Sequence, residues 1–150
     1  MRFHFLVLLA LSGIVLGAGG SQNESLKQEV DRLQGTWAPQ SSITEGAEAA
    51  KEELAVLRLI IKGNRWSYSI GGGKSVFQPE PKFTVNPKAN PKTLDVVSVK
   101  QKGKSLLRAI YELEGDTLKI CFAVGDAERP KEFKSTARSR SGITVYKRVK

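Results

Sequence analysis

Short extended segments follow one another along most of the chain, and this pattern constrains the fold more than any other feature. Within each segment apolar residues alternate with polar ones, and turns rich in Gly, Asn or Pro separate the segments. No helices of 10–15 residues alternate with them. The predicted strands are residues 36–43, 56–62, 65–70, 76–85, 93–100, 106–113, 117–124 and 143–149, with a further short candidate at 132–136. The sequence therefore predicts an all-β fold, an antiparallel barrel or sandwich of about eight strands.

Three segments depart from regular alternation. Residues 23–34 predict a short N-terminal helix, because Leu26, Val30 and Leu33 share one face and Asn23 or Ser25 can cap its start. Residues 45–54 are rich in Ala and Glu and predict a loop or a short exposed helix. Pro79 and Pro81 interrupt the 76–85 segment, which predicts an edge or bulged strand.

The hairpin around Gly115-Asp116 allows a register to be predicted. A two-residue turn there pairs Leu113 with Leu118, Tyr111 with Ile120, Ala109 with Phe122, and Glu112 with Lys119. A slip of one residue would mix the two faces. This register places Cys121, the only cysteine, on the opposite face beside Ile110. Cys121 is therefore interpreted as a buried structural residue under a loop or the N-terminal helix.

The first twenty residues have the pattern of a secretory signal. Arg2 precedes an apolar stretch at 5–16, and small residues follow at 17–20. The apolar stretch is shorter than the roughly 20 residues of a membrane span, although a retained N-terminal anchor is the alternative. We expect residues 1–20 to be a signal peptide and 21–150 to form one domain. The expected location is the periplasm, the cell envelope or the extracellular space.

The mature chain would contain no histidine, because His4 lies in the signal segment. This excludes Ser-His-Asp and Cys-His catalysis and histidine-based zinc sites. Glu112, Glu114 and Asp116 are explained by the hairpin and its turn, and Asp95 is interpreted as bonding locally to the Asn90-Pro91 turn. We therefore predict a protein that is not an enzyme, with no catalytic residues, no metal site and no cofactor.

Loss of the signal leaves 23 basic residues against 15 acidic ones, a net charge of +8. Such a charge favours an anionic partner, which could be a surface polymer, an acidic lipid or another protein. One basic cluster is Lys100, Lys102, Lys104 and Arg108, and a second is Arg138, Arg140, Lys147, Arg148 and Lys150. Aromatic residues do not interleave with the first cluster, which together with export argues against nucleic acid as a partner.

Several segments in order resemble one family. They are Leu33-Gln34-Gly35-Thr36-Trp37, then residues 91–95, residues 110–123, residues 129–133 and Lys147-Arg148-Val149. The combination is similar to the uncharacterised lipocalin-like domain found repeatedly in exported proteins of planctomycete bacteria. The resemblance covers nearly all of the mature chain and implies a small antiparallel lipocalin-like β-barrel with a short N-terminal helix. It implies no activity, substrate or catalytic residue.

Gly35-Thr36-Trp37 also resembles the Gly-x-Trp element of lipocalins and related calycin barrels. This resemblance implies that Trp37 closes the base of the barrel. It also implies that a basic residue of the last strand, Arg148 or alternatively Lys147, packs over the indole ring.

A barrel of eight strands can be filled by its own side chains or can hold one small ligand. The predicted interior positions are Leu57, Leu59, Ile61, Trp66, Tyr68, Ala109, Tyr111, Ile120 and Phe122. Of these, Trp66, Tyr68, Tyr111 and Phe122 are the candidates to contact a small apolar ligand. The alternative is a side-chain-filled barrel that serves as an interaction module for envelope proteins or polyanions.

Overall fold

The computed structural model describes residues 19–150, with side chains from residue 23 onward. The predicted signal peptide, residues 1–20, lies outside the described residues except for the backbone of its last two. The helices are α1 (Gly19–Leu33) and α2 (Lys51–Val56). The strands are β1 (Gly35–Thr44), β2 (Ala47–Glu48), β3 (Leu57–Lys62), β4 (Arg65–Ile70), β5 (Lys82–Asn86), β6 (Lys92–Val97), β7 (Ser105–Glu114), β8 (Thr117–Ala123) and β9 (Ser141–Arg148).

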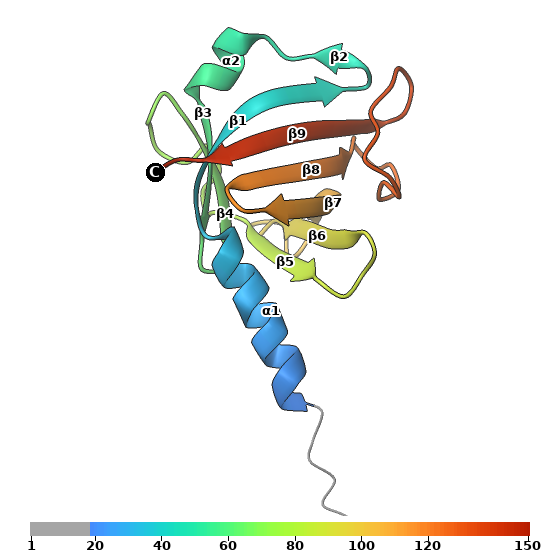
Figure 1. The fold of residues 1–150 in the computed structure, drawn as a ribbon. Coiled ribbons are helices and arrows are strands. Elements are labelled where there is room, and N and C mark those ends of the chain that lie inside the picture. Colours follow the sequence, from blue (N-terminus) through green and yellow to red (C-terminus); the bar gives the residue numbers. More distant parts are fainter. Residues whose placement is uncertain (1–18) are drawn as a thin grey trace, which may run out of the picture.

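Eight strands form a closed antiparallel barrel behind a short N-terminal helix (Figure 1). The order around the barrel is β1-β3-β4-β5-β6-β7-β8-β9, and β9 pairs again with β1. The two-residue strand β2 pairs only with the end of β1. The β4–β5 junction is the weakest, since Arg65 and Lys82 are its single strand pair. The predicted all-β, lipocalin-like architecture is confirmed.

The barrel has two distinct ends. We call the end that carries α1 and the tight turns at residues 63–64, 87–91 and 115–116 the closed end. We call the other end the mouth, where the connections are residues 45–56, 71–81, 98–104 and 124–140. Figure 1 shows α1 projecting from one end of the barrel, with α2 at the opposite end. Among the described residues, no helix has the length and apolarity to cross a membrane.

The closed end is filled by side chains. The buried core there includes Leu33 from α1, Trp37, Trp66 and Tyr111. The Trp37 indole donates a hydrogen bond of 3.0 Å to the Leu33 carbonyl, which ties the helix to the first strand. The predicted contact of Arg148 with Trp37 is present, with the guanidinium carbon 4.1 Å from the ring centroid. Arg148 also donates to Asp116, to the Arg32 carbonyl in the last turn of α1 and to the Gln34 carbonyl just after it, so it closes this end of the barrel.

The predicted hairpin register is confirmed pair for pair, from Ala109–Phe122 to Leu113–Leu118. The Glu112–Lys119 ion pair forms across it at 2.8 Å. Cys121 lies opposite Ile110 and is fully buried. Its sulfur lies 3.5 Å from the Glu132 carbonyl, so the connection at residues 124–140 covers it. Two features were sufficient to determine this register. Side chains alternate between the two faces every two residues, and each face has a single environment.

Several predicted boundaries were wrong. Helix α1 begins at Gly19, so Asn23 and Ser25 lie inside it, because a cap preference of about 1 kcal/mol does not stop a helix that can continue. Strand β5 begins only at Lys82, because the two prolines before it lack the N–H groups that a ladder requires. Residues 132–136 form no strand: residues 132 and 133 are bends, and residues 134–136 are irregular. The short helix predicted as one alternative for residues 45–54 is present as α2, which begins at Lys51, and the two-residue strand β2 precedes it.

Candidate ligand-binding cavity

A cavity of about 400 Å³ occupies the mouth half of the barrel. No charged residue lines it. Eight of its lining residues are apolar and four carry hydroxyl groups. The apolar ones are Leu54, Leu57, Ile70, Val76, Phe77, Leu107, Ile120 and Phe122, and the hydroxyl-bearing ones are Ser42, Tyr68, Thr144 and Tyr146. Its volume lies within the range of about 300–1,000 Å³ that small-molecule sites occupy.

Strand alternation explains why these residues face inward. Leu57 leads β3, Tyr68 and Ile70 end β4, and Leu107 begins β7, so all four lie near the mouth on the interior face. Core residues follow on the same strand faces toward the closed end, such as Leu59 below Leu57 and Ala109 below Leu107. The cavity is therefore the unfilled upper part of the interior whose lower part is the core.

The connection at residues 71–81 supplies the outer wall. The Val76 amide donates to the Tyr68 carbonyl at 2.8 Å, and the Gly71 amide donates to the Val56 carbonyl at the same distance. These bonds hold the connection against the mouth, so Val76 and Phe77 line the cavity while 49% and 42% of their surfaces remain exposed. Leu54 of α2 is the buried residue of that helix and lines the cavity from the other side.

The polar side of the cavity consists of hydroxyl groups. The Tyr68 and Tyr146 oxygens are 3.4 Å apart, and the Ser42 and Thr144 oxygens are 2.9 Å apart. Burial raises the pKa of the Tyr68 hydroxyl, against smaller opposing effects of hydrogen bonds from Tyr146 and Trp66. Burial likewise raises the pKa of Tyr146 well above 10. The cavity therefore offers neutral hydrogen-bonding groups and no acid, base or nucleophile with a lowered pKa.

A glycine makes room for the aromatic ring that forms one wall. Gly142 pairs with Phe122 across β8 and β9, and the Phe122 ring lies over it. A Cβ atom added at Gly142 would come within 2.3 Å of the ring. Phe122 can keep its position in the cavity wall only because residue 142 has no side chain.

The structure separates the four predicted ligand-contacting residues into two pairs. Tyr68 and Phe122 line the cavity. Trp66 lies below it, with its ring edge-on to Tyr68 at a centroid distance of 6.2 Å and tilted against Phe83 at 5.9 Å. Tyr111 is buried at the closed end, where its hydroxyl donates to Glu29. Trp66 and Tyr111 therefore do not line the cavity.

The polar cluster around Glu29, which anchors α1 to the barrel, was not predicted from the sequence. One Glu29 oxygen accepts hydrogen bonds from Lys92 at 2.7 Å and Tyr111 at 3.0 Å, and the other accepts from Arg32 at 3.1 Å. Burial raises the pKa of Glu29, but the hydrogen bonds from Lys92 and Tyr111 and the two positive charges outweigh it, so the pKa lies below 4.5. Glu29 is not one of the apolar residues that define a helix face in the sequence, and its burial depends on residues that are distant in sequence.

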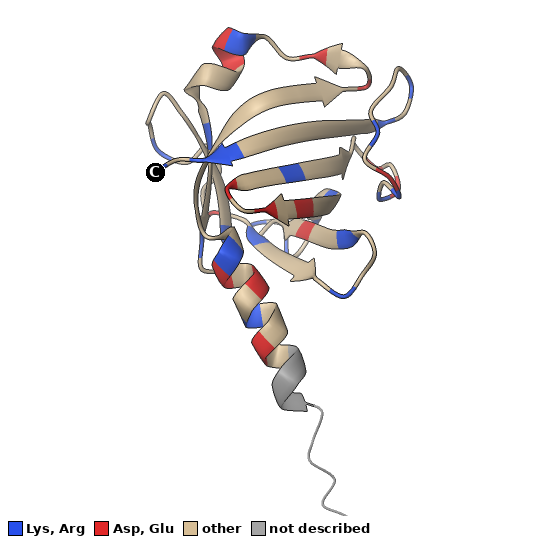
Figure 2. Ribbon diagram, in the orientation of Figure 1, with Lys and Arg blue, Asp and Glu red and all other residues tan. Residues whose placement is uncertain are grey.

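The two predicted basic clusters differ in structure. The first cluster has three exposed lysines in the connection at 98–104, Lys100, Lys102 and Lys104, and none of them forms an ion pair among the described residues. Its fourth member, Arg108, donates two hydrogen bonds to the Ala127 carbonyl. The second cluster is divided between the two ends of β9, roughly 20 Å apart along the strand (Figure 2). It is therefore not one patch.

The interpretation of Asp95 was wrong. Asp95 does not bond to the Asn90-Pro91 turn. Its carboxylate accepts two hydrogen bonds from Arg129, at 2.7 and 2.9 Å. The other guanidinium nitrogen of Arg129 donates to the carbonyls of Leu94 and Ala109. Asp95 and Arg129 thus fasten the connection at 124–140 to the outside of β6 and β7.

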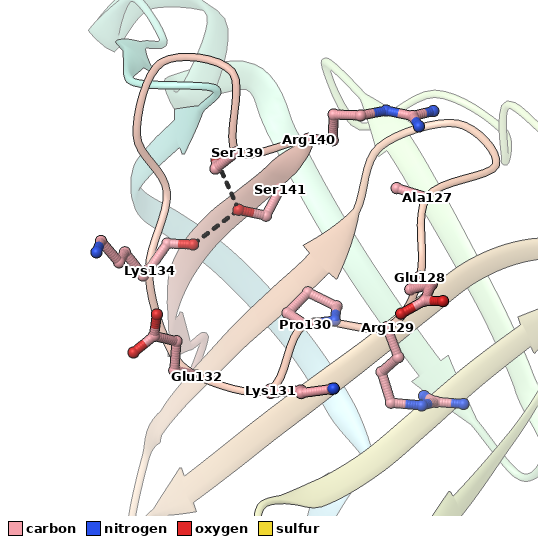
Figure 3. A pocket seen from close by; sticks show the side chains of 10 residues that line it. All are labelled: Ala127, Glu128, Arg129, Pro130, Lys131, Glu132, Lys134, Ser139, Arg140 and Ser141. Carbon is pink, nitrogen blue, oxygen red and sulfur yellow. Dashed lines mark hydrogen bonds between the residues drawn. The ribbon is translucent and has the colours of Figure 1, made fainter.

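A second hollow, of about 430 Å³, lies within that connection (Figure 3). The Ser141 hydroxyl donates to the Lys134 carbonyl at 2.7 Å, and its oxygen lies 2.8 Å from that of Ser139. Two of its cations are already paired, Arg129 with Asp95 and Arg140 with Asp126. Its polar groups hold the connection in shape over Cys121, whose pKa burial raises.

Among residues 19–150, no three or more His, Cys, Asp or Glu side chains gather where they could hold a metal ion. The chain gives no significant match to models of protein families, to curated proteins or to solved structures.

Proposed function

We propose that the protein binds a small apolar ligand in the mouth cavity and catalyses no reaction. The observation that carries the proposal is the cavity of about 400 Å³ with eight apolar lining residues and no charged one. A side-chain-filled barrel would leave no such space. Burial of an apolar molecule there would gain about 25 cal/mol for each Å² of apolar surface removed from water.

The hydroxyl groups define the polar part of the proposed ligand. Tyr68 and Tyr146 are 3.4 Å apart, a long contact that either hydroxyl can exchange for a shorter bond to a ligand. A carbonyl, ether or hydroxyl group fits these neutral partners, whereas a fully buried carboxylate would find no cation in the cavity lining. The proposed ligand is therefore mainly apolar, with a neutral polar group at the level of the tyrosines.

The test uses N-phenyl-1-naphthylamine, a neutral apolar fluorophore whose emission rises in apolar surroundings. We expect the wild-type protein to bind it saturably. Leu107→Trp fills part of the cavity and should weaken binding at least about tenfold. The matched control is Val145→Trp, which adds the same ring on the outward face of β9 and should leave the affinity within about twofold.

Two results would overturn the proposal. One is a wild-type protein that binds neither the fluorophore nor any molecule from its own host. The other is equal loss of binding in the Leu107 and Val145 variants when thermal unfolding shows both to be folded.

The alternative function is an interaction module for envelope proteins or polyanions. The observation in its favour is the exposed group of Lys100, Lys102 and Lys104 without anionic partners in the described structure. Both functions place the protein outside the cytoplasm, as the segment at residues 1–20 indicates. N-terminal sequencing of the protein recovered from its host tests export, because retention of residue 1 would contradict signal cleavage.

A further inference from the structure

Most of the large apolar side chains that are exposed among the described residues lie at the mouth. Of the eight large apolar side chains that the described residues leave exposed, six lie around the mouth: Val56, Ile70, Val76, Phe77, Val99 and Leu106. The other two, Leu26 and Val149, lie toward the closed end. Exposed apolar side chains gathered at one end mark an interaction surface more strongly than the same residues scattered singly.

Two of the mouth connections bring these apolar residues together with lysines. We call this surface the basic lip, and it consists of residues 71–81, residues 98–104 and Leu106. Phe77 of the first connection and Lys100 of the second line one shallow groove of about 180 Å³, together with Leu106. Lys74, Lys100, Lys102 and Lys104 of the basic lip are exposed, and none forms an ion pair among residues 19–150.

The charge of the mouth is uneven. Residues 98–104 carry three lysines and no acid, and residues 71–81 add Lys74 and one acid, Glu80. The acidic residues Glu45, Glu48, Glu52 and Glu53 belong to a different mouth connection, residues 45–56, on and around β2 and α2. Among the described mouth connections, only those of the basic lip combine exposed large apolar side chains with an excess of positive charge.

We propose that the basic lip docks on an anionic lipid surface. Apolar side chains that enter the headgroup region and lysines that meet the lipid phosphates are the two contributions that hold a peripheral protein on such a surface. A soluble polyanion would use the lysines but would gain nothing from Val99 and Leu106. The orientation also turns the cavity mouth toward the membrane, because Phe77 lines both the groove and the cavity.

The experiment measures flotation of the full-length mature protein with vesicles of phosphatidylcholine alone and with about 30% phosphatidylglycerol. We expect binding only to the anionic vesicles, and weaker binding at high salt. Replacement of Lys100, Lys102 and Lys104 by Gln should lower the partition coefficient roughly a hundredfold, since each lysine near the surface contributes about fivefold. The matched control replaces Lys62, Lys88 and Lys150 by Gln. This variant has the same net charge as the first, but its substitutions lie at the closed end, so it should retain most of the binding.

The apolar contribution is tested separately with Val99→Ser combined with Leu106→Ser. Neither residue lines the cavity, so fluorophore binding reports on the proposed ligand site independently of docking. We expect this variant to lose about tenfold or more in binding to anionic vesicles at unchanged net charge.

Four results would overturn the docking proposal. They are equal binding to neutral and anionic vesicles, no binding to either, equal losses from the two lysine triples, and unchanged vesicle binding of the Val99/Leu106 variant. The last result, with retention on soluble polyphosphate, would assign the lysines to a polyanion instead. Failure of docking with intact fluorophore binding would leave the ligand proposal standing.

Discussion

Replacement of Glu29 by glutamine should weaken the attachment of α1 to the closed end of the barrel. The Glu29 side chain is 6% exposed, and its carboxylate meets Lys92, Tyr111 and Arg32 within 3.1 Å. Glutamine has the same shape and keeps a neutral bond to Tyr111. It loses the charge, and its amide N–H₂ group has to face either Lys92 or Arg32, because each of these cations donates to a different carboxylate oxygen of Glu29.

The magnitude follows from these contacts. A hydrogen bond to a charged group contributes about 1.5–3 kcal/mol, against about 1 kcal/mol for a neutral one. The loss at Lys92 is therefore about 0.5–2 kcal/mol. The uncompensated charge of Lys92 and of the half-exposed Arg32 adds to it. The lower desolvation cost of the amide offsets part of this loss. We expect a net destabilisation of about 2 kcal/mol, which lowers Tm by roughly 6–10 °C in a domain of this size.

The pH dependence provides an independent check. The pKa of Glu29 is lower in the folded protein than the value of about 4.3 expected in the unfolded chain. Its contribution to stability is therefore complete above that unfolded value and is lost as the pH falls through the folded pKa. The difference between wild type and Glu29→Gln should be complete at pH 7 and should shrink below about pH 4.

The assay is urea unfolding followed by tryptophan fluorescence, since both Trp37 and Trp66 are buried and report on the core. Glu112→Gln is the matched control, because Glu112 forms an ion pair of similar length with Lys119 but is 44% exposed. It should cost less than about 0.5 kcal/mol. A Glu29→Gln variant within 0.5 kcal/mol of wild type, or a difference that grows as the pH falls, would refute the reasoning.

Three further predictions concern other parts of the barrel. Arg148→Lys should lower the free energy of unfolding by about 1–2 kcal/mol in urea titrations, because one ammonium group cannot serve Asp116, the α1 carbonyls and the Trp37 ring together. An unchanged midpoint would contradict this role. In the native protein at pH 8, a thiol reagent should label Cys121 no faster than the segment that covers it opens, whereas in urea the rate should be that of a free thiol. Fast labelling of the native protein would show that residues 124–140 do not cover Cys121. Gly142→Ala should push the Phe122 ring aside and weaken fluorophore binding by about tenfold, whereas equal affinity would place the ligand elsewhere.

The fold was predictable for strands in which each of the two faces keeps the same environment along the whole strand. Alternation between core and surface along β7 and β8 leaves a single register in which Leu113 meets Leu118 and Glu112 meets Lys119. The packing of Arg148 over Trp37 was predictable by resemblance, because Trp37 belongs to a short Gly-x-Trp motif and Arg148 lies in the last strand. The outward position of Cys121 followed from the same register.

The cavity and the Glu29 cluster were not predictable in this way, because both depend on contacts between distant segments. Whether Tyr68 or Tyr111 meets open space depends on the tilt of the strands and on which end α1 covers, and neither is a periodic property of the sequence. Residues 71–81 were expected to be partly strand, yet their two prolines leave them as the outer cavity wall. Gly142 gave no signal, because only its strand partner Phe122 explains the missing side chain.

Native mass spectrometry of the protein purified from its own host tests the central claim most directly. We predict that the wild-type protein carries a bound apolar molecule of a size that suits a cavity of about 400 Å³, and that Leu107→Trp, purified in the same way, is empty. A folded wild-type protein that is recovered without any ligand and that binds no apolar probe would contradict the account.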